Sequence, residues 1–100
     1  MIKHIVMFRL EASEAVVAVA ASKFKSAIEA LPQKIEALDA VEVGINDGPA
    51  SGNWNIVLTA ECATYDALQA YSAHPEHLAC VAIIKPYIAE RACVDYTVAD

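Results

Sequence analysis

Residues 2–10 constrain the fold more than any other segment, because they form a run that is apolar on both of its faces. In an extended strand, alternate side chains point to opposite sides. One side would carry Ile2, His4, Val6, Phe8 and Leu10, and the other Ile5 and Met7 with Lys3 and Arg9. A strand that is apolar on both sides is covered on both sides. The pattern therefore predicts a buried first strand with His4 inside the protein.

The next segments predict a helix followed by two strands. Ser13 is expected to cap an amphipathic helix that ends near Leu31, because Pro32 disfavours helix at the residue before it. Residues 33–38 are expected to form a short helical turn. Strands are predicted around residues 41–45 and 54–62, and the loop 46–53 would join them as an antiparallel hairpin.

The last third of the chain predicts helix and then strand. Thr64 is expected to cap a second helix, and Pro75 fits the first position of a further helical segment. That segment ends at Lys85-Pro86, and residues 88–98 form a final strand. The predicted order is therefore β-α-β-β-α-β.

This order predicts an α+β domain with the ferredoxin-like fold, in which helices cover one face of a four-stranded antiparallel sheet. The other face would remain apolar, and 57% of the 100 residues are hydrophobic. Two such sheets that pair face to face would bury it and form a dimeric α+β barrel. We expect one domain over residues 1–100 and a homodimer.

Charge and hydropathy exclude several classes of function. The formal charge is −6 and the seven basic residues are scattered, so no nucleic-acid partner is expected. No apolar run approaches about 20 residues, so no membrane partner is expected either. The N-terminus lacks signal-peptide features, and a cytoplasmic location is predicted. Cys62, Cys80 and Cys93 are expected to be reduced, largely buried thiols without a basic neighbour in the sequence.

The segment Tyr71-Ser72-Ala73-His74-Pro75-Glu76-His77 holds two of the three histidines. If it meets His4 in space, the protein gains one compact site for proton transfer. His77 could then act as a base near neutral pH, and Tyr71 could orient it or donate a hydrogen bond.

Each of these side chains also has a structural interpretation. His77 could bond local backbone, His74 could cap the segment that Pro75 opens, and His4 could be a core histidine with a hydrogen-bond partner. His4, His74 and His77 with Glu76 could in principle bind a metal, but His-x-x-His beside a proline is a weak signal. No metal or cofactor is predicted.

Several motifs together resemble the stress-responsive dimeric α/β-barrel (Dabb) family over nearly the whole chain. They are Met1 to Phe8, Leu31-Pro32, Val41 to Gly44, the HPxH segment Tyr71 to His77, Lys85-Pro86 and Val94-Asp95-Tyr96. The resemblance implies the same dimeric ferredoxin-like fold. One branch of the family consists of polyketide cyclases that close a ring by intramolecular aldol condensation. Their site residues match His4, Tyr71 and His77, although this chain lacks the branch's bulkier aromatic positions.

Two main interpretations of function follow. In the first, the protein binds a small apolar or aromatic carbonyl compound and acts on it as a cofactor-free cyclase or lyase through His77, Tyr71 and His4. In the second, it is a non-catalytic dimeric stress-response or structural domain whose histidines only satisfy the core. A third interpretation, a cofactor-free monooxygenase, rests on analogy between folds alone.

Overall fold

The computed structural model describes residues 1–99 and has the predicted order of elements, with residue 100 of the predicted domain outside the described residues. The strands are β1 (Ile2–Leu10), β2 (Ala40–Ile45), β3 (Ile56–Cys62) and β4 (Ile88–Thr97). The helices are α1 (Glu14–Glu29), α2 (Tyr65–Ala73) and α3 (Pro75–Val81), with 3-10 turns η1 (Leu31–Gln33) and η2 (Lys85–Tyr87).

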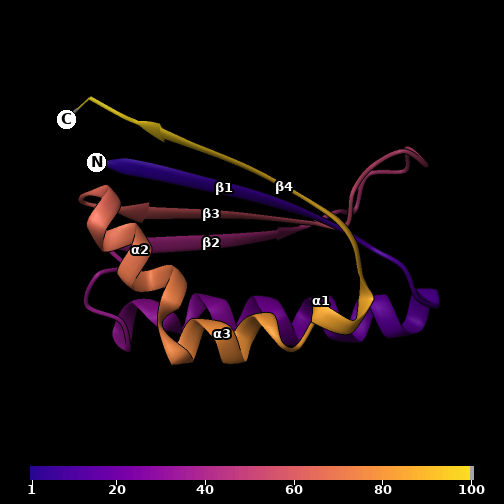
Figure 1. Ribbon diagram of the computed structural model, residues 1–100. Helices are drawn as coiled ribbons and strands as arrows, with labels where there is room; N and C mark the ends of the chain where they lie inside the picture. The colour runs from indigo at the N-terminus through magenta and orange to yellow at the C-terminus, as the bar shows by residue number, and fades with distance from the viewer. Residues whose placement is uncertain (100) are drawn as a thin grey trace.

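The four strands form one antiparallel sheet in the order β2-β3-β1-β4, and the helices lie together on one face of it (Figure 1). This is the ferredoxin-like arrangement that the order of elements predicted. The central strand β1 pairs with β3 on one side and with β4 on the other. His4 therefore lies directly between Ala60 of β3 and Asp95 of β4.

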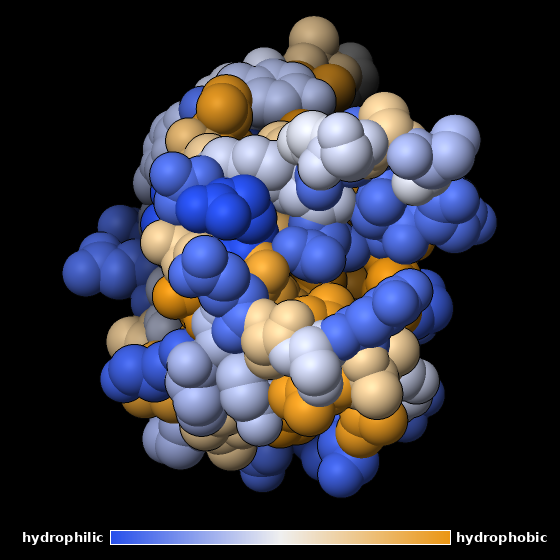
Figure 2. Space-filling model, turned by 90° about the vertical axis from the view of Figure 1, so that its right-hand side faces the viewer, coloured by the Kyte–Doolittle hydropathy of each residue, from blue (hydrophilic) through white to orange (hydrophobic). Residues whose placement is uncertain are grey.

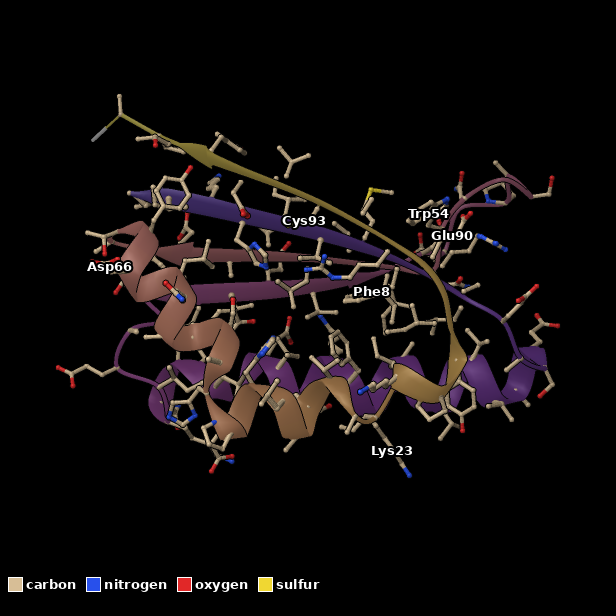
Figure 3. All side chains as sticks on the ribbon, in the orientation of Figure 1. Phe8, Lys23, Trp54, Asp66, Glu90 and Cys93 are labelled. Carbon is tan, nitrogen blue, oxygen red and sulfur yellow. The ribbon has the colours of Figure 1, made fainter. Side chains whose placement is uncertain are left out.

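The core lies between the sheet and the helices. On β1, Ile2, His4, Val6, Phe8 and Leu10 are buried, whereas Met7 on the opposite face is exposed. Phe8 packs edge-to-face on Phe24 of α1 with ring centroids 5.8 Å apart, and Figure 3 shows Phe8 in the space between the two layers. The predicted alternation of the first strand is confirmed, with His4 on the helical side, whereas the cover predicted for its second face is not present within residues 1–99.

Side-chain caps begin the helices as predicted. The Ser13 hydroxyl accepts a hydrogen bond from the backbone N–H of Val16, and the Thr64 hydroxyl accepts one from Ala67. The helical turn expected at residues 33–38 forms earlier, as η1, because Pro32 suits the first turn of a new helical segment.

The third strand begins later than predicted. It was expected from Trp54, but β3 starts at Ile56. The reason is local. The side-chain oxygen of Asn55 accepts a hydrogen bond from the backbone N–H of Leu10 at 2.7 Å, and the backbone N–H of Asn55 donates to the carbonyl oxygen of Phe8. Asn55 thereby joins the loop to β1 before regular pairing starts.

The face of the sheet away from the helices is uncovered and carries a group of apolar side chains, as predicted, beside charged ones such as Arg9 and Glu90. Met7 pairs with Val57 of β3, and Ile5 pairs with Val94 of β4. Val94 is 62% exposed and the neighbouring Tyr96 is 42% exposed. We call this surface the open face.

A hollow also lies beside the first half of α1. It has a volume of about 530 Å³, and Val16, Val19, Ile83 and Tyr87 are among the residues that line it. Figure 2 views the end of the molecule where α1 begins and shows hydrophobic residues at the surface of the helical layer among hydrophilic ones. The titratable side chains among its lining residues are Lys23 and Tyr87, and none of the predicted site residues lies there.

Within residues 1–99, no helix has both the length and the hydropathy that crossing a membrane requires.

Candidate functional site

A second cavity lies between the sheet and the helices and contains two of the predicted site residues. Its volume is about 270 Å³. The polar lining consists of His4, Ser72, His77 and Arg91. The rest of the wall is apolar and comes from β1, β3, β4, α1 and α3: Val6, Phe8, Phe24, Leu58, Leu78, Val81 and Ile88. The fold thus brings His4 of the first strand and His77 of the HPxH segment to one enclosed space.

Tyr71 meets both histidines but does not line this cavity. Its side chain is fully buried, with its ring centroid 4.5 Å from that of His77 and 6.5 Å from that of His4. Because α2 ends at Ala73 and Pro75 starts α3 in a new direction, His77 folds back against Tyr71. The three predicted residues therefore form one cluster, in which the tyrosine supports the two imidazoles from within the core.

The hydroxyl of Tyr71 is buried without a hydrogen-bond partner among the described residues. Such a group costs about 1–3 kcal/mol of stability. Burial raises the pKa of Tyr71 well above its ordinary value, and the nearby thiols of Cys62 and Cys80 add to the shift. The hydroxyl therefore stays protonated and has an unused donor.

His77 is held as one tautomer. Its Nδ1 lies 3.0 Å from the carbonyl oxygen of Ser72, which can only accept, so Nδ1 carries the proton. Burial lowers the pKa of His77; the hydrogen bond to the Ser72 carbonyl opposes this shift, and the electrostatic interactions with His4 and Arg91 add to it. A neutral imidazole with a free lone pair on Nε2 is therefore the form present near neutral pH.

His4 has a carboxylate partner that the sequence did not identify. Its Nδ1 lies 2.5 Å from Oδ1 of Asp95, which stands directly opposite it on β4. The carboxylate fixes the orientation of the ring and can balance its charge when His4 binds a proton. Position 95 shares a strand face with positions 91 and 93, but that regularity alone does not show which face meets His4.

The prediction for the cysteines is partly wrong. Cys62 and Cys80 are buried and free, but Cys93 is exposed on the edge strand β4. It also has a basic neighbour, because its Sγ lies 3.5 Å from Nδ1 of His4. Partial burial and the Asp95 carboxylate raise the pKa of the Cys93 thiol, so it remains protonated and is not an activated nucleophile.

The metal set considered from the sequence does not assemble. His74 caps α3, with its Nδ1 accepting the backbone N–H of Glu76 at 3.1 Å, and it does not line the cavity. Among residues 1–99, His4, Cys93 and Asp95 do place ligand atoms within 4.8 Å of one another. However, two nitrogen or oxygen ligands of a tetrahedral zinc lie roughly 3.3 Å apart. The 2.5 Å between His4 and Asp95 fits a shared proton instead.

The fold and the cavity define a ferredoxin-like α+β domain with paired histidines under the sheet. The sequence matches the Stress responsive A/B Barrel Domain (Dabb) family over residues 2–98, and the chain belongs to this family. No curated protein sequence matches it significantly.

Solved structures agree with this assignment. A dimeric protein of unknown function with a ferredoxin-like fold from Bacteroides fragilis is 41% identical, with a TM-score of 0.93 over 97% of this chain and 95% of that one. A dimeric ferredoxin-like protein from Thermobifida fusca is 29% identical, with a TM-score of 0.77 over 97% and 90%.

Two enzymes share the fold at low identity. An antibiotic biosynthesis monooxygenase is 13% identical, with a TM-score of 0.77 over the whole of both chains. The hydroxynitrile lyase from Passiflora edulis is 12% identical, with a TM-score of 0.70 over 99% of this chain and 94% of that one. At these identities the likeness shows the fold alone.

Proposed function

We propose that this protein binds a small carbonyl compound in the histidine-lined cavity and acts on it as a cofactor-independent lyase or cyclase. The observation that carries the proposal is the convergence of His4 and His77 on one apolar cavity, each with Nδ1 already occupied. An enclosed apolar space with a few converging polar groups is the usual form of a small-molecule site. The hydroxynitrile lyase adds support by analogy, because the same fold serves lyase chemistry there.

The size of the cavity limits the ligand. An apolar cavity of about 150 Å³ holds benzene, and typical ligand pockets begin near about 300 Å³. At about 270 Å³, this cavity would hold a single ring with a short substituent or an aliphatic chain of similar size. The aromatic wall of Phe8 and Phe24 suits such a ligand.

The proposed chemistry begins at His77. Its Nε2 takes a proton from the carbon next to the ligand's carbonyl group, and the electron pair moves onto the carbonyl oxygen. With its Nδ1 bonded to Asp95, His4 faces that oxygen and would stabilise the negative charge that develops there by donating from Nε2 when it carries a second proton. The enolate carbon then attacks a second carbonyl carbon to close a ring, and His77 returns its proton to the new alkoxide oxygen; the reverse sequence cleaves a carbon–carbon bond. Tyr71 holds the two imidazoles in place.

A non-catalytic, dimeric stress-response or structural domain is the second candidate. It is favoured by the fact that each of the three histidines has an intramolecular partner: Asp95 for His4, the Ser72 carbonyl for His77, and the Glu76 N–H for His74. In that case the histidines satisfy the fold and no ligand enters.

A thermal-shift screen separates the two candidates. Wild type, His77→Ala and the control His74→Ala are heated with small aromatic and polyketide-like carbonyl compounds. A ligand at about 100 times its dissociation constant adds about 2.7 kcal/mol, which raises the melting temperature by several degrees. We expect this shift in wild type and His74→Ala and its loss in His77→Ala. No shift in wild type with any compound would favour the non-catalytic domain.

We also propose that two copies pair through the open face, since the Bacteroides fragilis and Thermobifida fusca proteins are dimeric. If sedimentation at micromolar concentration gave a mass near 10.7 kDa, that of one chain, the result would contradict this pairing. The cytoplasmic location remains a prediction, supported by three free cysteines.

A further inference from the structure

We propose that the ligand of this cavity carries a carboxylate and that Arg91 binds it. This inference rests on the proposed function, because it concerns the same cavity and names the class of compound within it. The sequence did not identify Arg91, which the register of the sheet places at the site.

Arg91 belongs to the wall of the cavity. It pairs with Phe8 across the β1–β4 ladder, so its side chain is on the helical face of the sheet with Phe8 and His4. Because β4 is the edge strand, Arg91 is exposed as well as cavity-lining. Leu78 of α3 is also exposed and lines the same cavity. The cavity is therefore reached between β4 and α3, with the guanidinium at its opening.

Within residues 1–99, Arg91 has no carboxylate partner, and the nearby carboxylate of Asp95 is bonded to His4. The other residues of the cavity lining are His4, Ser72, His77 and apolar side chains, and none of them carries a carboxylate. A permanent cation beside apolar walls and neutral groups favours an anionic ligand.

Arg9 provides the contrast within the same two strands. It belongs to the opposite face of the sheet, where its Nε donates to Glu90 at 2.8 Å. In the described part of the chain, one arginine of this region is thus paired with a carboxylate and the one at the cavity is not.

Carboxylate is the anion that fits best. Guanidinium binds it through two parallel hydrogen bonds, which fix orientation as well as charge. Since Arg91 and His77 both line this cavity, a carboxylate on Arg91 would leave the adjoining part of the ligand beside the proposed base. The inferred substrate class is therefore small oxo acids, aromatic or aliphatic.

The test uses a matched pair of stable probes, 4-acetylbenzoate and its neutral amide 4-acetylbenzamide, measured by isothermal titration calorimetry. In wild type we expect the carboxylate to bind at least about tenfold more tightly than the amide. Arg91→Leu should remove this preference, because it weakens binding of the carboxylate more than binding of the amide, and Arg91→Lys should keep part of it. The control Arg9→Leu changes the net charge equally and should keep the full preference.

Each alternative result has a separate meaning. Equal binding of the two probes to wild type, or a preference that survives in Arg91→Leu, would overturn the role of Arg91 and leave the proposed function intact. An equal loss of preference in Arg9→Leu would show an effect of overall charge and would also overturn it. Binding of neither probe to wild type would contradict both the inference and the proposed function for this class of compound.

Discussion

The strands β1 and β4 are paired along most of their length, yet their helix-facing side chains have opposite environments. On β1 these side chains are buried, whereas on β4 Arg91, Cys93 and Asp95 are exposed. The helices pack over β1, β2 and β3, and β4 lies at the edge of the sheet (Figure 1). The cavity therefore has two kinds of wall. The central strand β1 supplies a buried and mostly apolar floor, and β4 at the edge supplies charged groups that a core would not accept.

The two faces of β4 should also differ in their role in the dimer, and a substitution on the open face has the largest expected effect. Val94→Asp places a charge on the open face, which would be buried in both copies of a dimer. An uncompensated buried charge costs about 3–5 kcal/mol, so we expect sedimentation to show a monomer at micromolar concentration. Val19→Asp changes a similarly exposed valine of α1, 55% against 62%, and should leave the dimer intact. A Val94→Asp protein that stays dimeric would contradict the pairing of open faces.

The free energy of unfolding should depend on the ring of Tyr71 and not on its hydroxyl. Tyr71→Ala empties a fully buried site and should lower the free energy of unfolding by about 3–5 kcal/mol in urea denaturation. Tyr71→Phe should leave stability unchanged or raise it, because the hydroxyl has no partner among residues 1–99. A loss above about 1 kcal/mol in Tyr71→Phe would mean that the hydroxyl is satisfied after all.

The buried histidine should make stability depend on pH. Burial lowers the pKa of His77 in the folded chain below its unfolded value of about 6.5. As the pH falls below about 6.5, the unfolded chain binds a proton at His77 before the folded chain does. The free energy of unfolding therefore decreases as the pH falls. We therefore expect wild type to lose more stability than His77→Gln between about pH 7.5 and 5.5 in urea titrations. Parallel losses in the two proteins would show that His77 is not desolvated.

The two histidines of the HPxH segment should behave differently, although they are three residues apart. His74→Ala removes only the cap of α3 and should lower stability by about 1 kcal/mol, with ligand affinity unchanged. His74→Asn, which keeps a capping side chain, should restore most of that stability. A fall in ligand affinity in His74→Ala would place His74 in the site and contradict the division of roles.

The contrast between the central strand β1 and the edge strand β4 also explains what the sequence could predict. Strand β1, the caps Ser13, Thr64 and His74, and the break at Pro75 follow from local patterns, because each depends on residues a few positions apart. The resemblance to the Dabb family supplied the cluster of His4, Tyr71 and His77. The position of Tyr71 behind the cavity wall was not predictable, because it depends on how α2 packs on the sheet.

The edge-strand half of the site was missed for a different reason. Asp95 is 91 residues from His4 in the sequence, and only the register between β1 and β4 brings them together. The pairing also shifts at Arg9 and Leu10, so the alternation within β4 could not show which of its faces meets the helices. Arg91 and Cys93 depend on the same register.

The central claim is that a ligand enters the cavity between His4 and His77, and the three histidines of the chain can report on it directly. We would record the imidazole signals by NMR while adding 4-acetylbenzoate, with His4→Asn, His74→Asn and His77→Gln used to assign them. The account predicts saturable shifts of the His4 and His77 signals and an unchanged His74 signal. Unchanged signals from both His4 and His77, or an equal shift at His74, would contradict it.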